Sequence, residues 1–177
     1  MAAARRPPPL LGPRFRARAA RIRLLVLDVD GVLTDGQIHY DGAGREFKSF
    51  HVRDGYGIVA LQKAGIAVAV ISGRGSRATA ARLRDLGIRH ARLQAGDKAA
   101  ALAAILRATG VPASALAAVG DDVPDVPVLE RAALAIAVGD AHPAIHPAVH
   151  ARTRQPGGRG AVREVCDLLL AARQPRR

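Results

Sequence analysis

A chain of 177 residues with 49% apolar but only 3% aromatic residues is long enough for one domain with a single core. No apolar run approaches the ~20 residues that a membrane-spanning helix needs, so we expect no membrane partner. The net charge is +12, but seven arginines within residues 5–23 and seven within 152–177 supply 14 of the 27 basic residues. Basic charge gathered at the two ends, without interleaved aromatic residues, argues against a nucleic-acid partner.

The first 22 residues are rich in arginine and proline and lack the uninterrupted apolar stretch of a signal peptide. We predict that residues 1–22 form a disordered basic tail, that one domain spans 23–172, and that 173–177 form a short tail. The single cysteine, Cys166, excludes an internal disulfide and fits the reducing cytoplasm. Its spacing from neighbouring apolar residues predicts a buried thiol on one helical face.

From residue 23 onward, apolar runs rich in β-branched residues alternate with helical patterns. The predicted strands are 24–28, 66–71, 91–94, 116–120 and 134–138. The predicted helices are 54–65, 76–86, 97–110 and one that follows the glycine-rich segment 155–160. The runs 37–40 and 45–52 flank the turn signal DGAG, which predicts a β-hairpin. This alternation predicts an α/β fold: a three-layer, Rossmann-like parallel sheet with helices on both faces and a small hairpin flap.

Three of the predicted strands lead into residues that can carry chemistry: Asp28, Ser72 and Asp121. Ligands of parallel sheets bind beyond the carboxyl ends of the strands. The sequence therefore predicts a site at this edge of the sheet.

The segment DVDG places Asp28 and Asp30 two positions apart, and Gly31 permits the turn that brings both carboxylates to one site. One carboxylate could attack phosphorus, and the other could protonate the leaving oxygen and then activate water. The alternatives are two turn-favouring acids or part of a calcium loop. The calcium loop is disfavoured because His39 stands where its bidentate Glu belongs.

Ser72 and Lys98 are candidate phosphate ligands. A hydroxyl between a strand and a helix can donate to a phosphoryl oxygen, although Ser72 could equally be an ordinary helix cap. A lysine in the first turn of a helix is disfavoured by the helix dipole, so Lys98 hints at a function; by itself, a solvated lysine is the simpler interpretation.

Three carboxylates, Asp121, Asp122 and Asp125, crowd the start of a predicted helix. Such residues can complement a helix N-terminus, but that explains one of them better than three. Hard carboxylate oxygens suit Mg²⁺, which needs few protein ligands beside water and phosphate. We therefore predict a Mg²⁺ site here.

Taken in this order, DVDG, Ser72, Lys98 and GDDVPD resemble the haloacid dehalogenase superfamily of aspartyl phosphotransferases over residues 28–125. The resemblance implies that Asp28 is the nucleophile and Asp30 the general acid and base. It implies that the Asp28 side chain, the Asp30 main-chain carbonyl and Asp121 hold Mg²⁺. The remaining implied roles are phosphoryl binding by Ser72 and Lys98 and support of the metal ligands by Asp122 and Asp125.

Further segments, among them FHVRDGYGI, ISGR, DAHP and GGRGAVREVCDLLL, are similar to the 3-deoxy-D-manno-octulosonate 8-phosphate phosphatase family over residues 24–172. That family is cap-less, uses a hairpin (here about 34–51) in place of a lid, and forms homotetramers through it. The resemblance implies that residues 157–159 can reach into a neighbouring site. Val59 departs from the family, which often has a basic residue there. Besides Asp30 and Lys98, the implied substrate contacts are His51, Val52, Arg53, Asp54, Gly55, Arg74 and Arg82.

The expected activity is therefore Mg²⁺-dependent hydrolysis of this sugar acid phosphate, a step in lipopolysaccharide sugar biosynthesis. Two alternatives remain: a phosphatase for a related nine-carbon sugar acid phosphate, and a non-catalytic phosphatase-like module that supports a sugar-nucleotide transferase. The spacing of His142, His146 and His150 would suit a metal stripe on a helix, but Pro143 and Pro147 interrupt that helix, so we expect loop residues.

Overall fold

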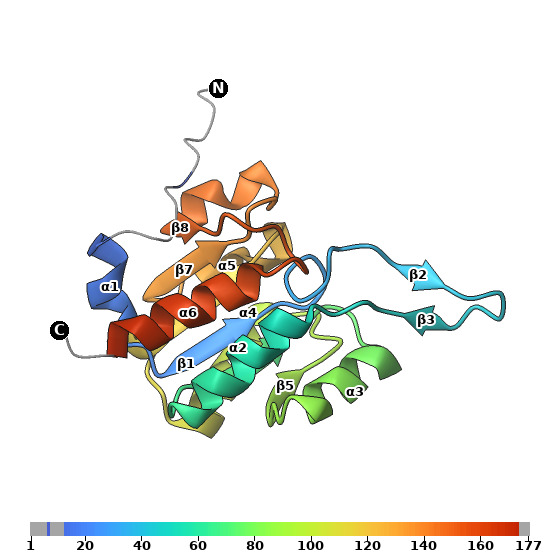
Figure 1. The fold of residues 1–177 in the computed structure, drawn as a ribbon, viewed down its shortest axis with the longest axis horizontal. Helices are drawn as coiled ribbons and strands as arrows, with labels where there is room; N and C mark the ends of the chain where they lie inside the picture. Colours follow the sequence, from blue (N-terminus) through green and yellow to red (C-terminus); the bar gives the residue numbers. More distant parts are fainter. Residues whose placement is uncertain (1–6, 8–12, 174–177) are drawn as a thin grey trace.

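The computed structural model describes residue 7 and residues 13–173, and at its centre is a six-stranded sheet (Figure 1). The strands are β1 (Leu24–Leu27), β4 (Ala67–Ile71), β5 (His90–Arg92), β6 (Leu116–Gly120), β7 (Leu134–Ala137) and β8 (Ala151–Arg152). Their order is β5-β4-β1-β6-β7-β8, and every neighbouring pair is parallel. The predicted parallel α/β sheet is confirmed.

Helices cover both faces of this sheet (Figure 1). The α-helices are α1 (Pro13–Ala19), α2 (Val52–Lys63), α3 (Arg77–Asp85), α4 (Lys98–Thr109), α5 (Val126–Leu129) and α6 (Ala161–Arg173). Short 3-10 helices are η1 (Ala113–Ala115), η2 (Val123–Asp125) and η3 (Pro143–Ala148). None of the helices within residues 13–173 has the length and apolarity that crossing a bilayer requires.

The strands are buried on both faces, which is why they are continuous apolar runs rather than alternating ones. In β1, Leu25 and Leu27 pack in a cluster with α1, α2 and α6, whereas Leu24 and Val26 pack in a second cluster with α4 and α5. Cys166 belongs to the first cluster, as predicted, and burial raises the pKa of its thiol.

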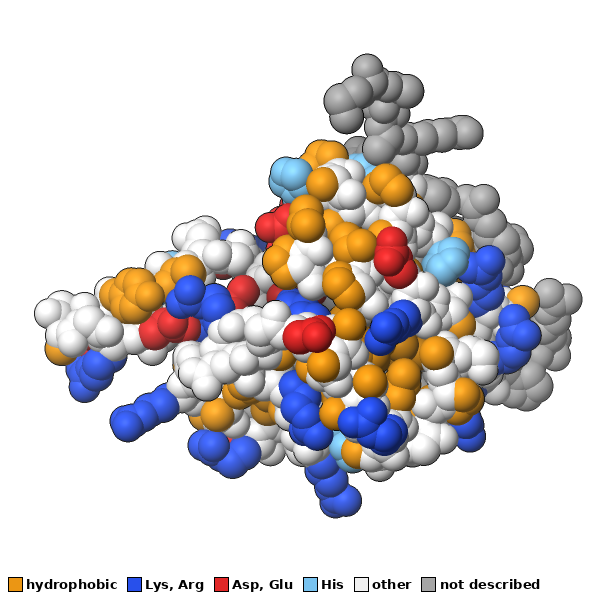
Figure 2. Space-filling model, turned by 180° about the vertical axis from the view of Figure 1, so that it is seen from behind, with side chains coloured by type: hydrophobic (Ala, Val, Ile, Leu, Met, Phe, Trp, Pro, Cys, Tyr) orange, Lys and Arg blue, Asp and Glu red, His pale blue; other side chains and the backbone are white. Residues whose placement is uncertain are grey.

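The predicted hairpin is present but short. Its strands β2 (His39–Tyr40) and β3 (Glu46–Phe47) pair in antiparallel fashion, and the hairpin projects from the body of the domain (Figures 1 and 2). The run 45–52 does not remain extended to its end, because α2 begins at Val52, two residues earlier than predicted. Gly65, with a φ of 78°, follows the end of that helix, as expected.

The predicted disordered tail over 1–22 is wrong for its second half, while residues 1–6 and 8–12 lie outside the described residues. Helix α1 packs against α6, and Phe15, Ala19 and Ile22 are buried in the core. These three residues recur at helical spacing, so one face of the segment is apolar although arginines cover the other. At the other end, Arg173 donates to the carbonyls of Ala64 and Ile22, so the domain extends through residue 173, one residue past the predicted boundary.

Two short elements at the sheet edge, β8 and η3, were not predicted. Strand β8 has two residues, too few for a periodic pattern, and η3 contains both prolines of the histidine-rich segment. The histidines of that segment have local hydrogen bonds: His142 Nδ1 accepts from Ala144 N (3.2 Å) and His150 Nδ1 from Ala135 N (3.0 Å). His146 thus lies within a 3-10 helix rather than in the expected loop, with His142 capping that helix and His150 beyond its end.

Candidate active site

The site lies where the direction of the chain through the sheet reverses. After β1 the chain adds β4 and β5 on one side, then returns to add β6 and β7 on the other. The carboxyl ends of β4, β1 and β6 therefore lie side by side, and they lead into Ser72, Asp28 and Asp121. This is the position at which open parallel sheets bind ligands.

The loop after β1 is shaped by Gly31. Its φ is 88°, and a Cβ at this position would lie 2.1 Å from Asp121 Oδ2. The buried Thr34 hydroxyl accepts from the main-chain N–H groups of Gly31 and Gly36, both at 3.3 Å. Position 31 therefore requires glycine for two reasons: its backbone is left-handed, and the Asp121 carboxylate lies too close to leave room for a Cβ.

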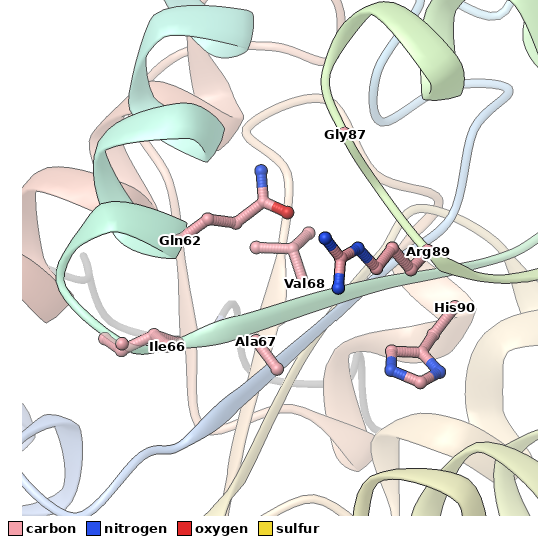
Figure 3. A pocket seen from close by; sticks show the side chains of 8 residues that line it. Gln62, Ile66, Ala67, Val68, Gly87, Arg89 and His90 are labelled. Atoms are coloured by element: carbon pink, nitrogen blue, oxygen red, sulfur yellow. The ribbon is translucent and has the colours of Figure 1, made fainter.

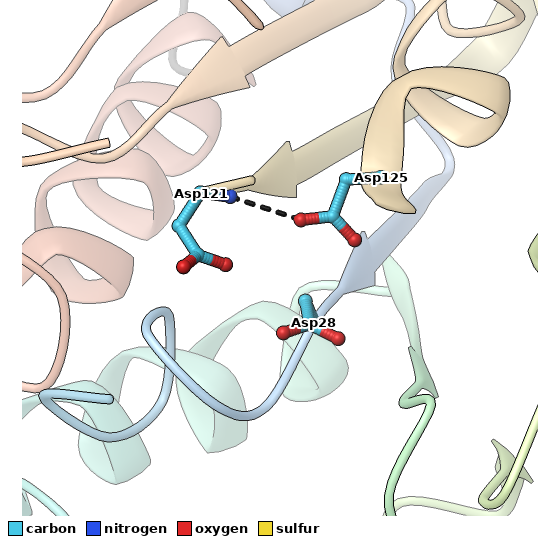
Figure 4. A group of neighbouring side chains, drawn as sticks. All are labelled: Asp28, Asp121 and Asp125. Atoms are coloured by element: carbon cyan, nitrogen blue, oxygen red, sulfur yellow. Dashed lines mark hydrogen bonds between the residues drawn. The ribbon is translucent and has the colours of Figure 1, made fainter. Parts of the chain in front are cut away.

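Three carboxylates meet at this point: Asp28, Asp121 and Asp125 each offer an oxygen within 4.8 Å of the others (Figure 4). Burial, with the charge of Asp125 adding to it, raises the pKa of Asp28 to about 7. Burial, with the charges of Asp28 and Asp125 adding to it, raises the pKa of Asp121 to about 8. Crowded, buried carboxylate oxygens of this kind fit a hard divalent cation, which would relieve their repulsion.

Asp125 differs from the other two because both of its oxygens are already engaged. Oδ1 accepts from Lys98 Nζ at 2.7 Å, and Oδ2 accepts from Asp121 N at 3.0 Å and from Asp122 N at 3.4 Å (Figure 4). Asp122 is exposed, and its side chain caps η2 by accepting from Val123 N. The geometry therefore places Asp28 and Asp121 at the centre and makes Asp125 their support.

Lys98 is the cation of this cluster. Its Nζ donates to Asp28 Oδ1 and to Asp125 Oδ1, both at 2.7 Å, and its side chain is almost fully buried. Burial opposes the charge, but the two carboxylates outweigh it and raise the pKa of Lys98 above its ordinary value. The position at the start of α4, which is unfavourable for an isolated helix, is explained by these two ion pairs.

Ser72 follows β4 and is buried. Its Oγ accepts from Arg74 N at 3.1 Å, so it closes the turn that leads to α3. The Arg74 guanidinium reaches the hairpin, where it pairs with Glu46 Oε2 at 3.0 Å.

Lys48, which lies just after β3 of the hairpin, was not predicted from the sequence. Its Nζ forms ion pairs with Asp30 Oδ1 and with Glu46 Oε1, the latter at 3.2 Å. The Lys48 side chain is only 2% exposed. An isolated lysine between phenylalanines carries no sequence signal of burial, so only the fold of the hairpin identifies it.

The predicted substrate contacts around the start of α2 divide into two groups. Val52 and Arg53 are exposed, whereas Asp54 and Gly55 are buried. The Asp54 carboxylate accepts from Arg163 N at 2.7 Å and from Gly160 N at 3.2 Å, so it caps the start of α6. Asp54 therefore faces the protein interior in this structure, not the carboxylate cluster.

The other members of this set lie near the hairpin. The Arg82 guanidinium lies 5.7 Å from the ring centroid of Phe50. His51 Nδ1 lies 4.0 Å from Asp54 Oδ2. His51 lines a hollow of about 400 Å³ at the base of the hairpin, together with residues such as His39 and Arg159. Val59 is partly buried and packs against the core.

Residues 157–159 lie against the loop after β1 of their own chain. Gly158 N donates to Val32 O at 2.9 Å, and Arg159 pairs with Asp35 at 3.2 Å. A Cβ at Gly157 would lie 1.7 Å from Gly31 O. These glycines let the segment lie directly on the loop of its own chain that carries Asp28 and Asp30.

A second hollow, of about 440 Å³, lies at the amino ends of β4 and β5, the opposite edge of the sheet. Gln62, Val68 and Arg89 are among the residues that line it (Figure 3). The catalytic candidates belong to the other edge, so this hollow is separate from the carboxylate cluster.

Comparisons with known proteins agree with the geometry. Residues 92–162 match the model of the haloacid dehalogenase-like hydrolase family. The chain is 48% identical over 156 residues to the 3-deoxy-D-manno-octulosonate 8-phosphate phosphatase KdsC of Escherichia coli (strain K12), covering 88% of this chain and 83% of the relative.

Solved structures are also similar to this chain, among them two phosphatases of this name. The 3-deoxy-D-manno-octulosonate 8-phosphate phosphatase of Yersinia pestis superposes with a TM-score of 0.87 at 47% identity, covering 89% of this chain and 85% of that one. The enzyme of that name from Moraxella catarrhalis, in complex with magnesium ion, phosphate ion and a KDO molecule, gives a TM-score of 0.86 at 40% identity, covering 89% and 90%.

Proposed function

Because the chain belongs to the 3-deoxy-D-manno-octulosonate 8-phosphate phosphatase family of haloacid dehalogenase-like hydrolases, we propose that it hydrolyses this ester to 3-deoxy-D-manno-octulosonate and phosphate. The observation that carries the proposal is the cluster of Asp28, Asp121, Asp125 and Lys98 at the carboxyl ends of β1 and β6. The reaction would serve lipopolysaccharide sugar biosynthesis.

The two-step chemistry follows from the carboxylates after β1. An oxygen of Asp28 attacks phosphorus, the bond to the sugar oxygen breaks, and Asp30 gives that oxygen its proton. Asp30 then takes a proton from water, whose oxygen attacks the aspartyl-phosphate. This second attack releases phosphate and restores the Asp28 carboxylate.

Asp28 and Asp121, with the Asp30 main-chain carbonyl, are the residues we propose as Mg²⁺ ligands. When bound, Mg²⁺ would neutralise charge on the phosphoryl oxygens and offset the burial and mutual repulsion that raise the pKa of Asp28 and Asp121. Asp125 and Asp122 support this arrangement through the hydrogen bonds described above, since Asp125 fixes both the Asp121 main chain and Lys98.

Lys98 and Ser72 are the proposed phosphoryl ligands. The Lys98 ammonium already contacts Asp28, so it lies beside the atom that attacks phosphorus. A charge held there stabilises the transition state more than a freely solvated charge would, because its position costs no reorganisation. The Ser72 hydroxyl can donate to a phosphoryl oxygen while still accepting from Arg74 N.

Recognition of the sugar acid needs a partner for its carboxylate. Arg74, Arg82 and Arg53 are the candidates, because guanidinium groups bind carboxylates in a bidentate manner. Arg74 pairs with Glu46 here, so substrate would have to compete with that ion pair. We include His51, Val52 and Gly55 in the proposed substrate surface and assign Asp54 to its support, because the Asp54 carboxylate is occupied by α6.

A homotetramer formed through the hairpin is part of the proposal. Ile38, Tyr40 and Phe47 are 45%, 60% and 50% exposed on this projecting element, and a two-stranded hairpin is marginally stable alone. Replacing Ile38 and Phe47 by serine should yield smaller species in light scattering. Arg45→Ser, on the same hairpin, should leave the assembly unchanged. A wild-type monomer, or an unchanged tetramer in the double variant, would contradict this assignment.

Phosphate release from a panel of sugar acid phosphates, with and without Mg²⁺, tests the function. We expect the eight-carbon ester to be turned over faster than the nine-carbon one, and only with Mg²⁺. Turnover of the nine-carbon ester alone would favour the related phosphatase. A failure to turn over any ester, including an aryl phosphate, would favour a non-catalytic module. We place the reaction in the cytoplasm, where the single Cys166 would remain a thiol.

A further inference from the structure

Lys48 is a buried cation that the proposed mechanism does not use. It lies on a hairpin whose neighbouring residues are largely exposed, yet its own side chain is 2% exposed. Lysine is almost never buried to this extent unless it is paired. Both of its partners are carboxylates: Asp30, which stands two residues after the nucleophile, and Glu46.

These contacts join the hairpin to both parts of the catalytic edge. Lys48 pairs with Asp30 of the loop after β1, and Glu46 pairs with Arg74 of the loop after β4. Within the described residues, no other ion pair of the Asp30 carboxylate is formed. The orientation of this side chain is therefore set by the hairpin rather than by its own loop.

We propose that Lys48 is a positioning residue that orients the Asp30 side chain toward the leaving oxygen, so that seating of the hairpin fixes the place of the residue that serves as acid and then as base. The inference rests on the proposed phosphatase function. General acid catalysis contributes roughly 10²–10⁴-fold and requires the donor within hydrogen-bond reach of the leaving oxygen. An Asp30 side chain released from Lys48 would sample several rotamers, and few of them would satisfy this requirement.

Two esters with different leaving groups distinguish a variant whose general acid is misplaced from one whose whole active site is damaged. An alkyl oxygen, as in the sugar acid phosphate, needs a proton as it leaves, whereas 4-nitrophenolate does not. Lys48→Met keeps the length of the side chain and removes its charge. We expect kcat/KM for the sugar acid phosphate to fall by about 10–100-fold and kcat/KM for 4-nitrophenyl phosphate by less than about threefold. Equal losses on both esters would overturn the proposal.

A double-mutant comparison tests whether Lys48 acts through Asp30. In an Asp30→Asn background, Lys48→Met should have no further leaving-group-dependent effect. If the full loss persists in that background, Lys48 contacts substrate directly and the proposal is wrong. Lys48→Arg keeps the charge and should recover most of the wild-type preference between the two esters.

Further variants distinguish three outcomes: a misfolded variant, a wrong proposed function and a wrong role for Lys48. Arg45→Met changes an 82% exposed cation of the same hairpin and should leave both rates unchanged. If Lys48→Met does not fold, as judged by circular dichroism, Lys48→Gln removes the charge but keeps a polar side chain, and it should show the same selective loss. A wild-type protein that hydrolyses neither ester would refute the proposed function and this inference with it. Normal wild-type turnover with an unselective Lys48→Met would refute this inference alone.

Discussion

Gly31→Ala is the smallest change that should disable the site without removing a functional group. The backbone φ of 88° is left-handed, and a side chain there costs roughly 1–2 kcal/mol. The added Cβ would lie 2.1 Å from Asp121 Oδ2 and 2.5 Å from its Cγ. Ordinary contact begins near 3.4 Å, so the carboxylate must move away by about 1.3 Å, the difference between the two distances.

A displacement of this size moves a proposed Mg²⁺ ligand away from Asp28. Misplacement of a reacting or positioning group by about 1 Å can cost on the order of 10²-fold in rate. We therefore expect kcat/KM to fall about 100-fold, the Mg²⁺ concentration for half-maximal activity to rise, and the free energy of unfolding to fall by about 1–2 kcal/mol. Mg²⁺ titrations of phosphate release and thermal unfolding measure the three quantities.

Gly110→Ala is the matched control. Gly110 also has a left-handed φ, 64°, but a Cβ there would meet nothing within 4 Å, and it follows the end of α4 that is remote from Lys98. It should lose stability while kcat/KM stays within about threefold of wild type. A Gly31→Ala protein with near wild-type activity, or an equal loss of activity in Gly110→Ala, would refute the reasoning.

Asp28→Asn should abolish turnover in phosphate-release assays while the thermal unfolding transition persists, and activity within about tenfold of wild type would exclude Asp28 as the nucleophile. Asp54→Ala should lower the free energy of unfolding by about 1–3 kcal/mol, since Gly160 N and Arg163 N lose a buried acceptor; an unchanged denaturant midpoint would contradict this. In metal-free protein, the raised pKa values of Asp28 (about 7) and Asp121 (about 8) mean that the folded state binds more protons than the unfolded chain, so their contribution to stability falls as pH rises from about 4 to about 8. Mg²⁺ should therefore raise the melting temperature more at pH 8 than at pH 5, and an equal rise at both would contradict this site.

The site residues Asp28, Asp121 and Lys98 were predictable because each stands in a recognisable local sequence pattern. Asp28 and Asp121 directly follow apolar strands, and Lys98 is anomalous for a helix start. Parallel topology alone then requires that these ends meet, so no knowledge of long-range contacts was needed. The α/β class and the hairpin were predictable in the same way.

Residues 13–19 were predicted to be disordered because their arginine-rich composition was given more weight than the helical spacing of their apolar residues. Arginines dominate the segment, but Phe15 and Ala19 on the helix and Ile22 just after it are buried. Amphipathic pattern decides burial even where overall charge is high. The interior position of Asp54 had no such local signal, because its partners Gly160 and Arg163 lie more than a hundred residues away in the sequence.

Lys48 and the 157–159 segment lead to one physical conclusion about the loop after β1. On one side the loop is contacted by a hairpin lysine, and on the other by glycines that lie directly on its main chain. A loop fixed from two sides, with Thr34 bonding its own backbone inside it, has few alternative conformations. Such rigidity holds Asp28 and Asp30 in place without any large lid over the site. We infer that the hairpin contributes to catalysis through this support as well as through any contact with another subunit.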